Sequence, residues 1–227
     1  MQQPPSVLLL GIGNVLWADE GFGVRVAETI QQQYDLPDNV VAMDGGTQGI
    51  YLIQHVQAAD ILIVFDAIDY GLPPATLKVI EGNDVPKFMG AKKMSLHQTG
   101  FQEVLAMAEM LGDYPDHLLL IGVQPVELDD YGGSLRDKVK AQIQPAILHA
   151  LEYLQNFAIE LPKRISLQKP DNALDLSRYE GERPSEDIAL RKGDGRVVLN
   201  DDFEIHYQPA SLENDGISVD VDHRGKY

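Results

Sequence analysis

Short apolar runs alternate with amphipathic stretches along the first two thirds of the chain, and this alternation predicts the fold class. The runs at 7–10 and 61–65 contain only apolar residues, which is typical of parallel strands buried on both faces. The strands expected from such runs are 7–12, 40–43, 60–66, 77–80 and 118–123.

The stretches between the strands have helical spacing. At 21–34, Phe22, Val26 and Ile30 recur one turn apart and form one apolar face. A short helix is expected at 48–57, and another begins at Thr99. Ser134 and Asp137 form a capping box that predicts one long helix running to Leu154. Strands that alternate with helices in this way predict a three-layer α/β/α domain with a mostly parallel, twisted sheet.

The domain is expected to occupy residues 1–162, because the alternation ends near Leu161. Residues 163–227 are rich in Asp, Glu, Arg, Gly and Pro and contain only short apolar runs. This composition predicts an acidic, polar C-terminal extension that is flexible or docked at the periphery of the domain.

Charge and composition narrow the classes of partner. The 227 residues carry a formal net charge of −17, which disfavours nucleic acid and anionic membranes. The chain has no cysteine, which excludes a thiolate nucleophile and a disulfide framework. No apolar stretch approaches the ~20 residues that span a bilayer. We therefore expect a cytoplasmic protein that binds neither nucleic acid nor membrane and, for want of a large apolar face, a monomer.

The candidate chemistry lies where the predicted strands end. Glu20 follows the first strand and Asp66 ends the third, and in a doubly wound sheet these two strands are usually neighbours. Both side chains are then expected at one crevice. The alternative is structural: Asp19 or Glu20 caps the following helix, and Asp66 accepts hydrogen bonds from loop amides.

His97 lies in a polar loop just before a predicted helix, where a histidine serves either as a surface or capping residue or as a ligand. With Glu20 and Asp66 it would form an oxygen and nitrogen set suited to nickel, zinc, manganese or iron. These three residues lack the local spacing of the common zinc motifs, so their pattern leaves both interpretations open.

Glycines mark two further turns. Gly11 and Gly13 follow the first strand as in dinucleotide-binding proteins, but Leu16 stands where the third glycine of that pattern belongs. After the second strand, the glycine pair predicts either a tight turn or a close approach by another backbone. This second segment consists of Asp44, Gly45, Gly46 and Thr47.

Six collinear segments, which cover roughly 7–161, resemble the [NiFe]-hydrogenase maturation endopeptidases. They are GIGNVLWADEGFGVRV, MDGGTQG, IVFDAIDYG, KKMSLHQTGFQEVL, LIGVQP and LDDYGGS. The fourth and the last are similar to the subgroup that serves uptake hydrogenases. The resemblance implies an α/β/α fold with a five-stranded sheet in which one strand is antiparallel. It also implies that Glu20, Asp66 and His97 bind the metal, and that the segment from Asp44 to Thr47 recognises the substrate.

The function implied by the resemblance is removal of the C-terminal peptide from a nickel-loaded hydrogenase large-subunit precursor. In this hypothesis the substrate carries the nickel, the protein holds no tightly bound metal of its own, and Glu20, Asp66 and His97 form the catalytic site. Asp66 is the first candidate for the general base. Two alternatives stay open: a chaperone that checks for nickel without cutting, and an NAD-dependent oxidoreductase that uses Gly11, Gly13 and Asp44.

Overall fold

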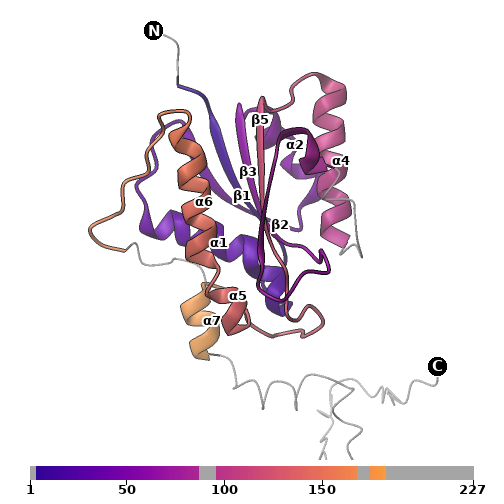
Figure 1. The fold of residues 1–227 in the computed structure, drawn as a ribbon, viewed down its shortest axis with the longest axis vertical. Helices are drawn as coiled ribbons and strands as arrows, with labels where there is room; N and C mark the ends of the chain where they lie inside the picture. The colour runs from indigo at the N-terminus through magenta and orange to yellow at the C-terminus, as the bar shows by residue number, and fades with distance from the viewer. Residues whose placement is uncertain (1–3, 87–95, 168–173, 183–227) are drawn as a thin grey trace, which may run out of the picture.

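A five-stranded sheet forms the centre of the computed structural model, which describes residues 4–86, 96–167 and 174–182, without the side chains of 96–100 and 182 (Figure 1). The strand order is β2-β1-β3-β5-β4, and only β4 runs antiparallel, against β5. The strands are β1 Val7–Ile12, β2 Val40–Gly46, β3 Ile61–Ala67, β4 Leu77–Glu81 and β5 His117–Val123. The predicted sheet, with its single antiparallel strand, is confirmed.

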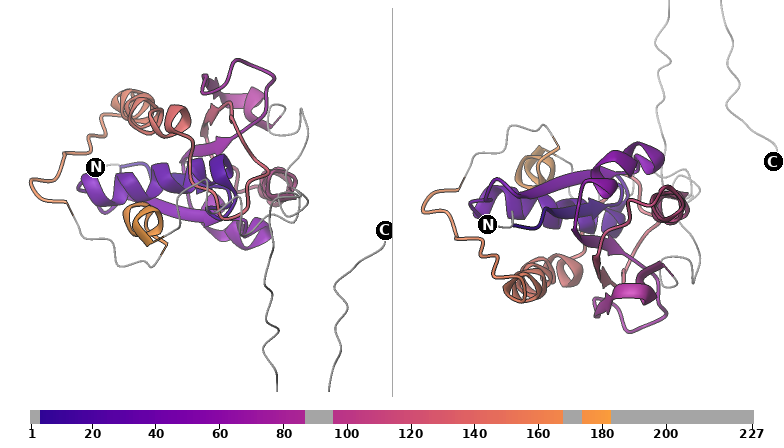
Figure 2. Two further views of the ribbon diagram at one scale, coloured as in Figure 1. Left: turned by 90° about the horizontal axis from the view of Figure 1, so that it is seen from below. Right: turned by 90° about the horizontal axis from the view of Figure 1, so that it is seen from above.

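Helices cover both faces of the sheet. One face carries α1 and α6, and the other carries α2 and α4, so that α6 and α4 lie on opposite sides (Figure 2). The helical elements are η1 Ala18–Gly21, α1 Phe22–Gln33, η2 Gly49–Leu52, α2 Ile53–Gln57, η3 Gly82–Asp84, α4 Leu96–Leu111, α5 Asp137–Lys140, α6 Ile143–Gln155 and α7 Leu176–Glu182. The structure therefore has the predicted three layers, and none of the described helices is long and apolar enough to cross a membrane.

Alternating side chains of the central strands build two apolar cores. Val7 and Leu9 of β1 pack in the core beneath α1 and α6, while Leu8 and Leu10 pack in the core beneath α2 and α4. Every residue of β1 and β3 is buried. Burial on both faces explains why these two strands are continuous apolar runs.

The long helix expected after Ser134 is instead two helices, α5 and α6. Pro145 is the physical reason, because it lacks an amide hydrogen and its ring clashes with the carbonyl four residues earlier, at Ala141. The predicted capping box is also wrong. Arg136 occupies the N-cap of α5 without a side-chain cap bond, and the Ser134 hydroxyl donates a hydrogen bond to Oε1 of Glu180 at 2.8 Å.

Two other predicted helix starts differ from the structure. Helix α4 begins at Leu96, so Thr99 lies inside it; the preference of threonine for a cap is a weak local signal. β2 continues to Gly46 across a register shift opposite Gly11 and Ile12, and the helical turn after it begins only at Gly49. The helix expected at 48–57 is therefore a 3-10 turn followed by the short α2, and both lie after the extended strand.

The described part of residues 163–227 contacts the domain. Lys163 pairs with Tyr34 in an isolated bridge, and the Arg164 side chain donates a hydrogen bond to the Tyr34 carbonyl at 2.8 Å. Further along, α7 lies against α1 and α5 (Figures 1 and 2). Residues 168–173 and 183–227 lie outside the described part, so the boundary and character assigned to the extension stay a prediction.

Candidate active site

The site predicted from the sequence falls where the strand order reverses, at the carboxyl ends of β1 and β3. These strands are parallel neighbours, with Gly11 opposite Phe65. From β1 the chain runs through α1 to β2, and it returns through α2, on the other face, to β3. The two connections diverge at this edge and leave room for a ligand outside the strand ends.

Two glycines allow α1 to begin directly against the sheet at this edge. A Cβ atom on Gly23 would lie 2.1 Å from the Phe65 carbonyl oxygen and 2.4 Å from that of Ile12. A Cβ atom on Gly11 would lie 2.2 Å from the Gly23 carbonyl oxygen. Such distances leave no room for a side chain at either position. The first turn of α1 therefore rests on the ends of β1 and β3, and the turn before it is fixed in place.

Glu20 lies in that turn, the 3-10 helix η1, and is half-buried. Its amide donates to the Trp17 carbonyl at 2.9 Å, and its carbonyl accepts from the Asn14 amide at 3.2 Å. Gly13 has a φ of +136°, and a Cβ atom there would lie 1.8 Å from the Glu20 carbonyl oxygen. The loop thus closes tightly around the backbone of Glu20 at the switch point.

Asp19, next to Glu20, has a structural role. Its buried carboxylate accepts hydrogen bonds from three amides of the loop after β5: Val126 at 2.8 Å, Glu127 at 2.9 Å and Arg136 at 2.7 Å. Burial raises the pKa of Asp19, and these hydrogen bonds and the Arg136 charge oppose the rise. Asp19 therefore stabilises the 126–136 loop and does not cap α1. Of the two acidic residues, Glu20 remains the candidate for metal binding or catalysis.

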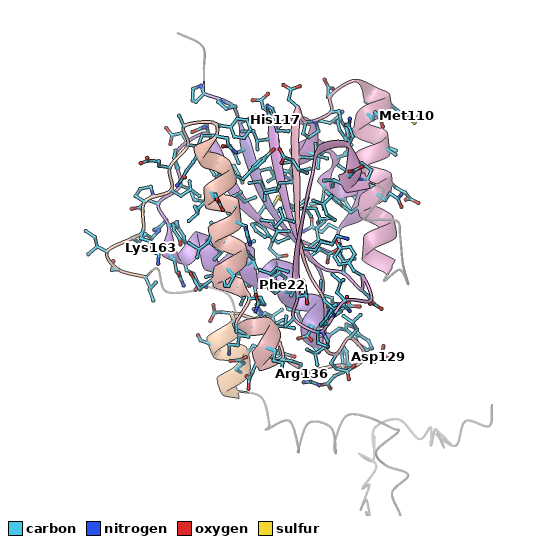
Figure 3. The ribbon with its side chains drawn as sticks, in the orientation of Figure 1. Phe22, Met110, His117, Asp129, Arg136 and Lys163 are labelled. Atoms are coloured by element: carbon cyan, nitrogen blue, oxygen red, sulfur yellow. The ribbon has the colours of Figure 1, made fainter. Side chains whose placement is uncertain are left out.

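The loop that Asp19 holds borders the same edge. Trp17 and Tyr131 form an isolated bridge and an edge-on ring contact with centroids 5.1 Å apart. Arg136 also forms an ion pair with Asp130 at 2.8 Å. In Figure 3, Phe22, Asp129 and Arg136 lie at the end of the molecule opposite His117, the first residue of β5. The carboxyl ends of the strands thus lie under this loop.

Asp66 lies in β3 and is fully buried. Strand alternation places it on the same face as Leu62 and Val64, which form the core beneath α4. Its Oδ1 accepts a hydrogen bond from the Ala67 amide at 2.8 Å, as the structural alternative expected. Burying a carboxylate is costly unless it is well paired, and buried charges at a sheet's switch point are typical of functional sites.

His97 is the second residue of α4, and its side chain lies outside the described residues. Helix α4 itself packs on the face of the sheet that carries Asp66, because Phe101 and Val104 of α4 lie in the same core as Val64. The described side chains, which do not include that of His97, contain no group of three or more His, Cys, Asp or Glu that could hold a metal ion. Its convergence with Glu20 and Asp66 stays a prediction.

Two residues that the sequence reasoning missed shape the loop after Asp66. Gln124 is 6% exposed; its Oε1 accepts from the Tyr70 and Leu72 amides, and its Nε2 donates to Asp69. The Tyr70 hydroxyl lies 2.7 Å from where a Cβ atom on Gly122 would be, and Gly122 is the register partner of Asp66. Burial, and then the Asp66 charge, raise the pKa of Tyr70. In the sequence, the available signal for this contact was Gly122, a glycine inside an otherwise apolar strand.

The segment from Asp44 to Thr47 lies beside β1 at the same edge. Gly46 has a φ of +48°, accepts the Gly13 amide on its carbonyl at 3.1 Å, and donates to Oδ1 of Asp44 at 2.8 Å. Gly45 is buried, and a Cβ atom there would lie 2.8 Å from a methyl group of Leu10. The segment is therefore a turn, as the first interpretation predicts, and it packs closely against β1 of the same chain. Its role in recognition stays a prediction.

The fold and this edge define the class of protein: an open α/β sheet with carboxylates at its switch point. A family model described as hydrogenase maturation protease matches residues 24–153. The hydrogenase expression/formation protein HupD of Thiocapsa roseopersicina is 60% identical over 205 residues, covering 88% of this chain and 93% of its own. The hydrogenase 2 maturation protease of Escherichia coli K12 is 38% identical and covers 68% of this chain and 93% of its own.

A solved structure shows the same relationship. The hydrogenase maturating endopeptidase HybD from E. coli superposes with a TM-score of 0.67 at 37% identity, over 70% of this chain and 98% of its own. The chain belongs to the hydrogenase maturation protease family. It is therefore a hydrolase, a maturation endopeptidase, and the oxidoreductase alternative is excluded.

Proposed function

We propose that this endopeptidase removes the C-terminal peptide of a [NiFe]-hydrogenase large-subunit precursor that already carries nickel. Glu20, Asp66 and His97 reach the nickel of the substrate, and the protein needs no tightly bound metal of its own. The observation that carries the proposal is the fully buried Asp66 at the switch point, adjacent in the sheet to the strand that leads into Glu20.

The chemistry assigned to each group follows from its place. A nickel ion held by carboxylate and imidazole ligands fixes the precursor tail at the strand ends and polarises the scissile carbonyl. Asp66 is the proposed general base that takes a proton from the attacking water, because its carboxylate lies near the carboxyl end of β3, beside the strand that leads into Glu20. The segment from Asp44 to Thr47 borders the crevice and is the proposed contact for the substrate backbone.

Intact-mass spectrometry of the precursor tests the proposal. Nickel-loaded precursor incubated with the protein should lose a C-terminal peptide, while nickel-free precursor should keep its full mass. Glu20→Gln, Asp66→Asn and His97→Ala should each lower the cleavage rate by about 10²-fold or more, as expected for groups acting at the reacting centre.

Asp137→Asn, an exposed carboxylate on α5, is the matched control and should cleave at the wild-type rate. Equal cleavage of nickel-free precursor would refute the use of nickel as a recognition element. Normal processing by all three site variants would refute the site. Binding of the nickel-loaded precursor without any loss of mass would favour the nickel-checking chaperone, which otherwise has no support from relatives named as proteases.

A further inference from the structure

Two aromatic side chains, which we call the aromatic pair, lie together beside the turn that holds Glu20. The rings of Trp17 and Tyr131 meet edge-on, with their centroids 5.1 Å apart and an interplanar angle of 62°. Tyr131 is 64% exposed, and Trp17 is half-buried. Neither ring belongs to the two apolar cores that the described residues form, so the fold does not use Tyr131 to bury apolar surface.

Backbone hydrogen bonds fix the aromatic pair in place. Trp17 and Tyr131 form an antiparallel bridge, and the Gly132 amide donates to the Leu16 carbonyl at 2.7 Å. The loop that carries Tyr131 is held in turn by the three amides that donate to the buried Asp19 carboxylate. A ligand that contacts a surface already fixed in this way loses little binding free energy to ordering it.

The aromatic pair lies within a few residues of chain from Glu20. The Glu20 amide donates to the Trp17 carbonyl at 2.9 Å, a bond that closes a turn of four residues. The Cα atoms of the first and last residues of such a turn lie within about 7 Å of each other. An extended peptide advances about 3.4 Å per residue, so a substrate whose reacting bond lies at Glu20 passes the aromatic pair within about two to four residues of that bond.

The loop around Tyr131 carries a surplus of negative charge. Between β5 and α5 it contains three acidic residues, Glu127, Asp129 and Asp130, and one basic residue, Arg136. Arg136 forms its ion pair with Asp130 at 2.8 Å, and Asp129 is exposed. In Figure 3, Asp129 and Arg136 lie at the end of the molecule that holds the carboxyl ends of the strands. This surplus favours a partner segment that carries a basic residue.

We propose that the aromatic pair binds the precursor chain within about four residues of the cleaved bond, with an apolar side chain of the precursor on the Tyr131 ring and a basic one near Asp129. Exposed aromatic rings on a fixed backbone are typical of the residues that contribute most to binding, because they bury a large area and lose few rotamers. The inference rests on the proposed function, which places cleavage at Glu20, and extends it to the selection of the substrate.

The first test is steady-state cleavage of nickel-loaded precursor by the full-length protein, with kcat and KM measured separately. Tyr131→Ala should raise KM about five- to tenfold and leave kcat within about twofold, because the contact is made equally in the ground and transition states. Tyr131→Phe keeps the ring and should leave KM within about twofold of wild type. Met110→Ala, an exposed apolar residue near the end of α4, is the control and should change neither constant.

Double-mutant cycles between protein and precursor test whether the contact is direct. The mass of the released peptide locates the cleaved bond, and each precursor residue within four positions of it is then replaced by alanine. At the apolar residue that the ring contacts, alanine should raise KM with the wild-type protein and cause no further rise with Tyr131→Ala. Alanine at the basic residue should couple in the same way to Asp129→Asn.

Three results would overturn the inference. They are an unchanged KM in Tyr131→Ala, an equal rise in Tyr131→Phe, and additive effects at every precursor position. Unfolding by urea at the wild-type midpoint should accompany the raised KM of Tyr131→Ala, because an exposed ring outside both cores is not needed for folding. If the wild-type protein fails to cleave the nickel-loaded precursor at all, the proposed function fails instead.

Discussion

Replacing Gly23 with alanine would drive a methyl group into the backbone of the two central strands. The new Cβ atom would lie 2.1 Å from the Phe65 carbonyl oxygen, 2.4 Å from the Ile12 carbonyl oxygen and 2.7 Å from the Phe65 carbonyl carbon. None of these atoms belongs to a flexible side chain, so α1 must move away from the sheet. Overpacking of this kind costs about 1–3 kcal/mol, and the gain of about 1 kcal/mol in helix propensity offsets only part of it.

We expect Gly23→Ala to lose about 2 kcal/mol of unfolding free energy, from the upper end of that range less the propensity gain, measured by urea denaturation. The same shift moves η1 away from β3, so cleavage activity should fall even at temperatures where the variant is fully folded. Gly181→Ala is the matched control, a helical glycine with nothing within 4 Å of its added Cβ atom, and should be neutral or slightly stabilising. Wild-type stability and activity in Gly23→Ala would refute the close-packing argument.

Two further predictions concern hydrogen bonds to carboxylates. Asp19→Ala leaves three loop amides without their acceptor and should lower the free energy of unfolding by about 3 kcal/mol or more in urea denaturation. The control, Asp116→Asn at an exposed position, should lower it by less than about 0.5 kcal/mol. Similar losses in the two variants would contradict the role assigned to Asp19. Hydrogen bonds from the Ser6 amide and hydroxyl lower the pKa of Asp60 in the folded protein. The Asp60 carboxylate therefore stabilises the fold at pH values above its pKa in the unfolded chain, near 4. This contribution is lost as the pH falls through its pKa in the folded protein. Asp60→Asn should therefore be less stable than wild type at about pH 6 and closer to it at about pH 3, and a difference independent of pH would be contrary evidence.

The sheet was predictable because burial on both faces leaves a strong local signal. The apolar runs of β1 and β3 and the alternation with helices led directly to the three-layer class. Helix starts were less predictable, because they depend on contacts that are remote in sequence. Ser134 has the residue type and spacing of an N-cap, yet its hydroxyl donates to Glu180, which lies 46 residues away in the chain.

The same difference between local signals and contacts remote in sequence applies to the residues of the candidate site. The position of Asp66 at the carboxyl edge of the sheet could be predicted because Asp66 directly follows the apolar run of a parallel strand, and that of Glu20 because the loop after β1 begins at the same edge. The different roles of Asp19 and Glu20 could not be predicted, because they depend on three amides of the loop after β5 that donate hydrogen bonds to the Asp19 carboxylate.

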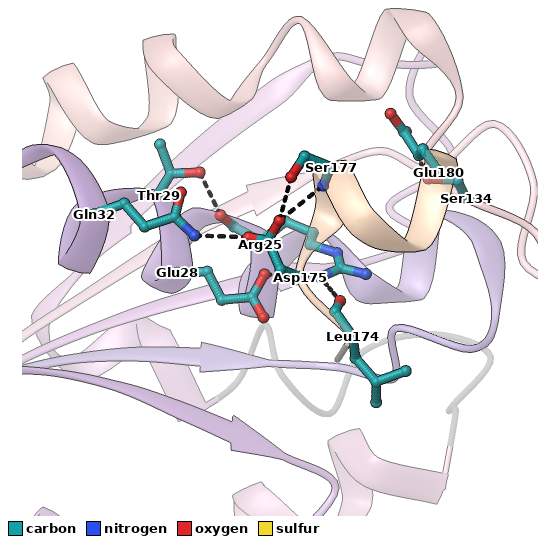
Figure 4. A network of polar contacts seen from close by, with 9 residues as sticks. All are labelled: Arg25, Glu28, Thr29, Gln32, Ser134, Leu174, Asp175, Ser177 and Glu180. Atoms are coloured by element: carbon teal, nitrogen blue, oxygen red, sulfur yellow. Dashed lines mark hydrogen bonds and ion pairs between the residues drawn. The ribbon is translucent and has the colours of Figure 1, made fainter. Parts of the chain in front are cut away.

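Arg25 was harder still to identify. In the sequence it is a lone basic residue on a helix with an apolar face, and its three partners, Glu28, Leu174 and Tyr179, come from α1 and from a segment about 150 residues away. Burying an arginine is costly unless each of its partners is in place, so residues 174–182 and α1 must fit together for the arrangement to persist (Figure 4). A fit between segments so far apart in the chain leaves no local pattern, and for this reason the sequence alone could not reveal it.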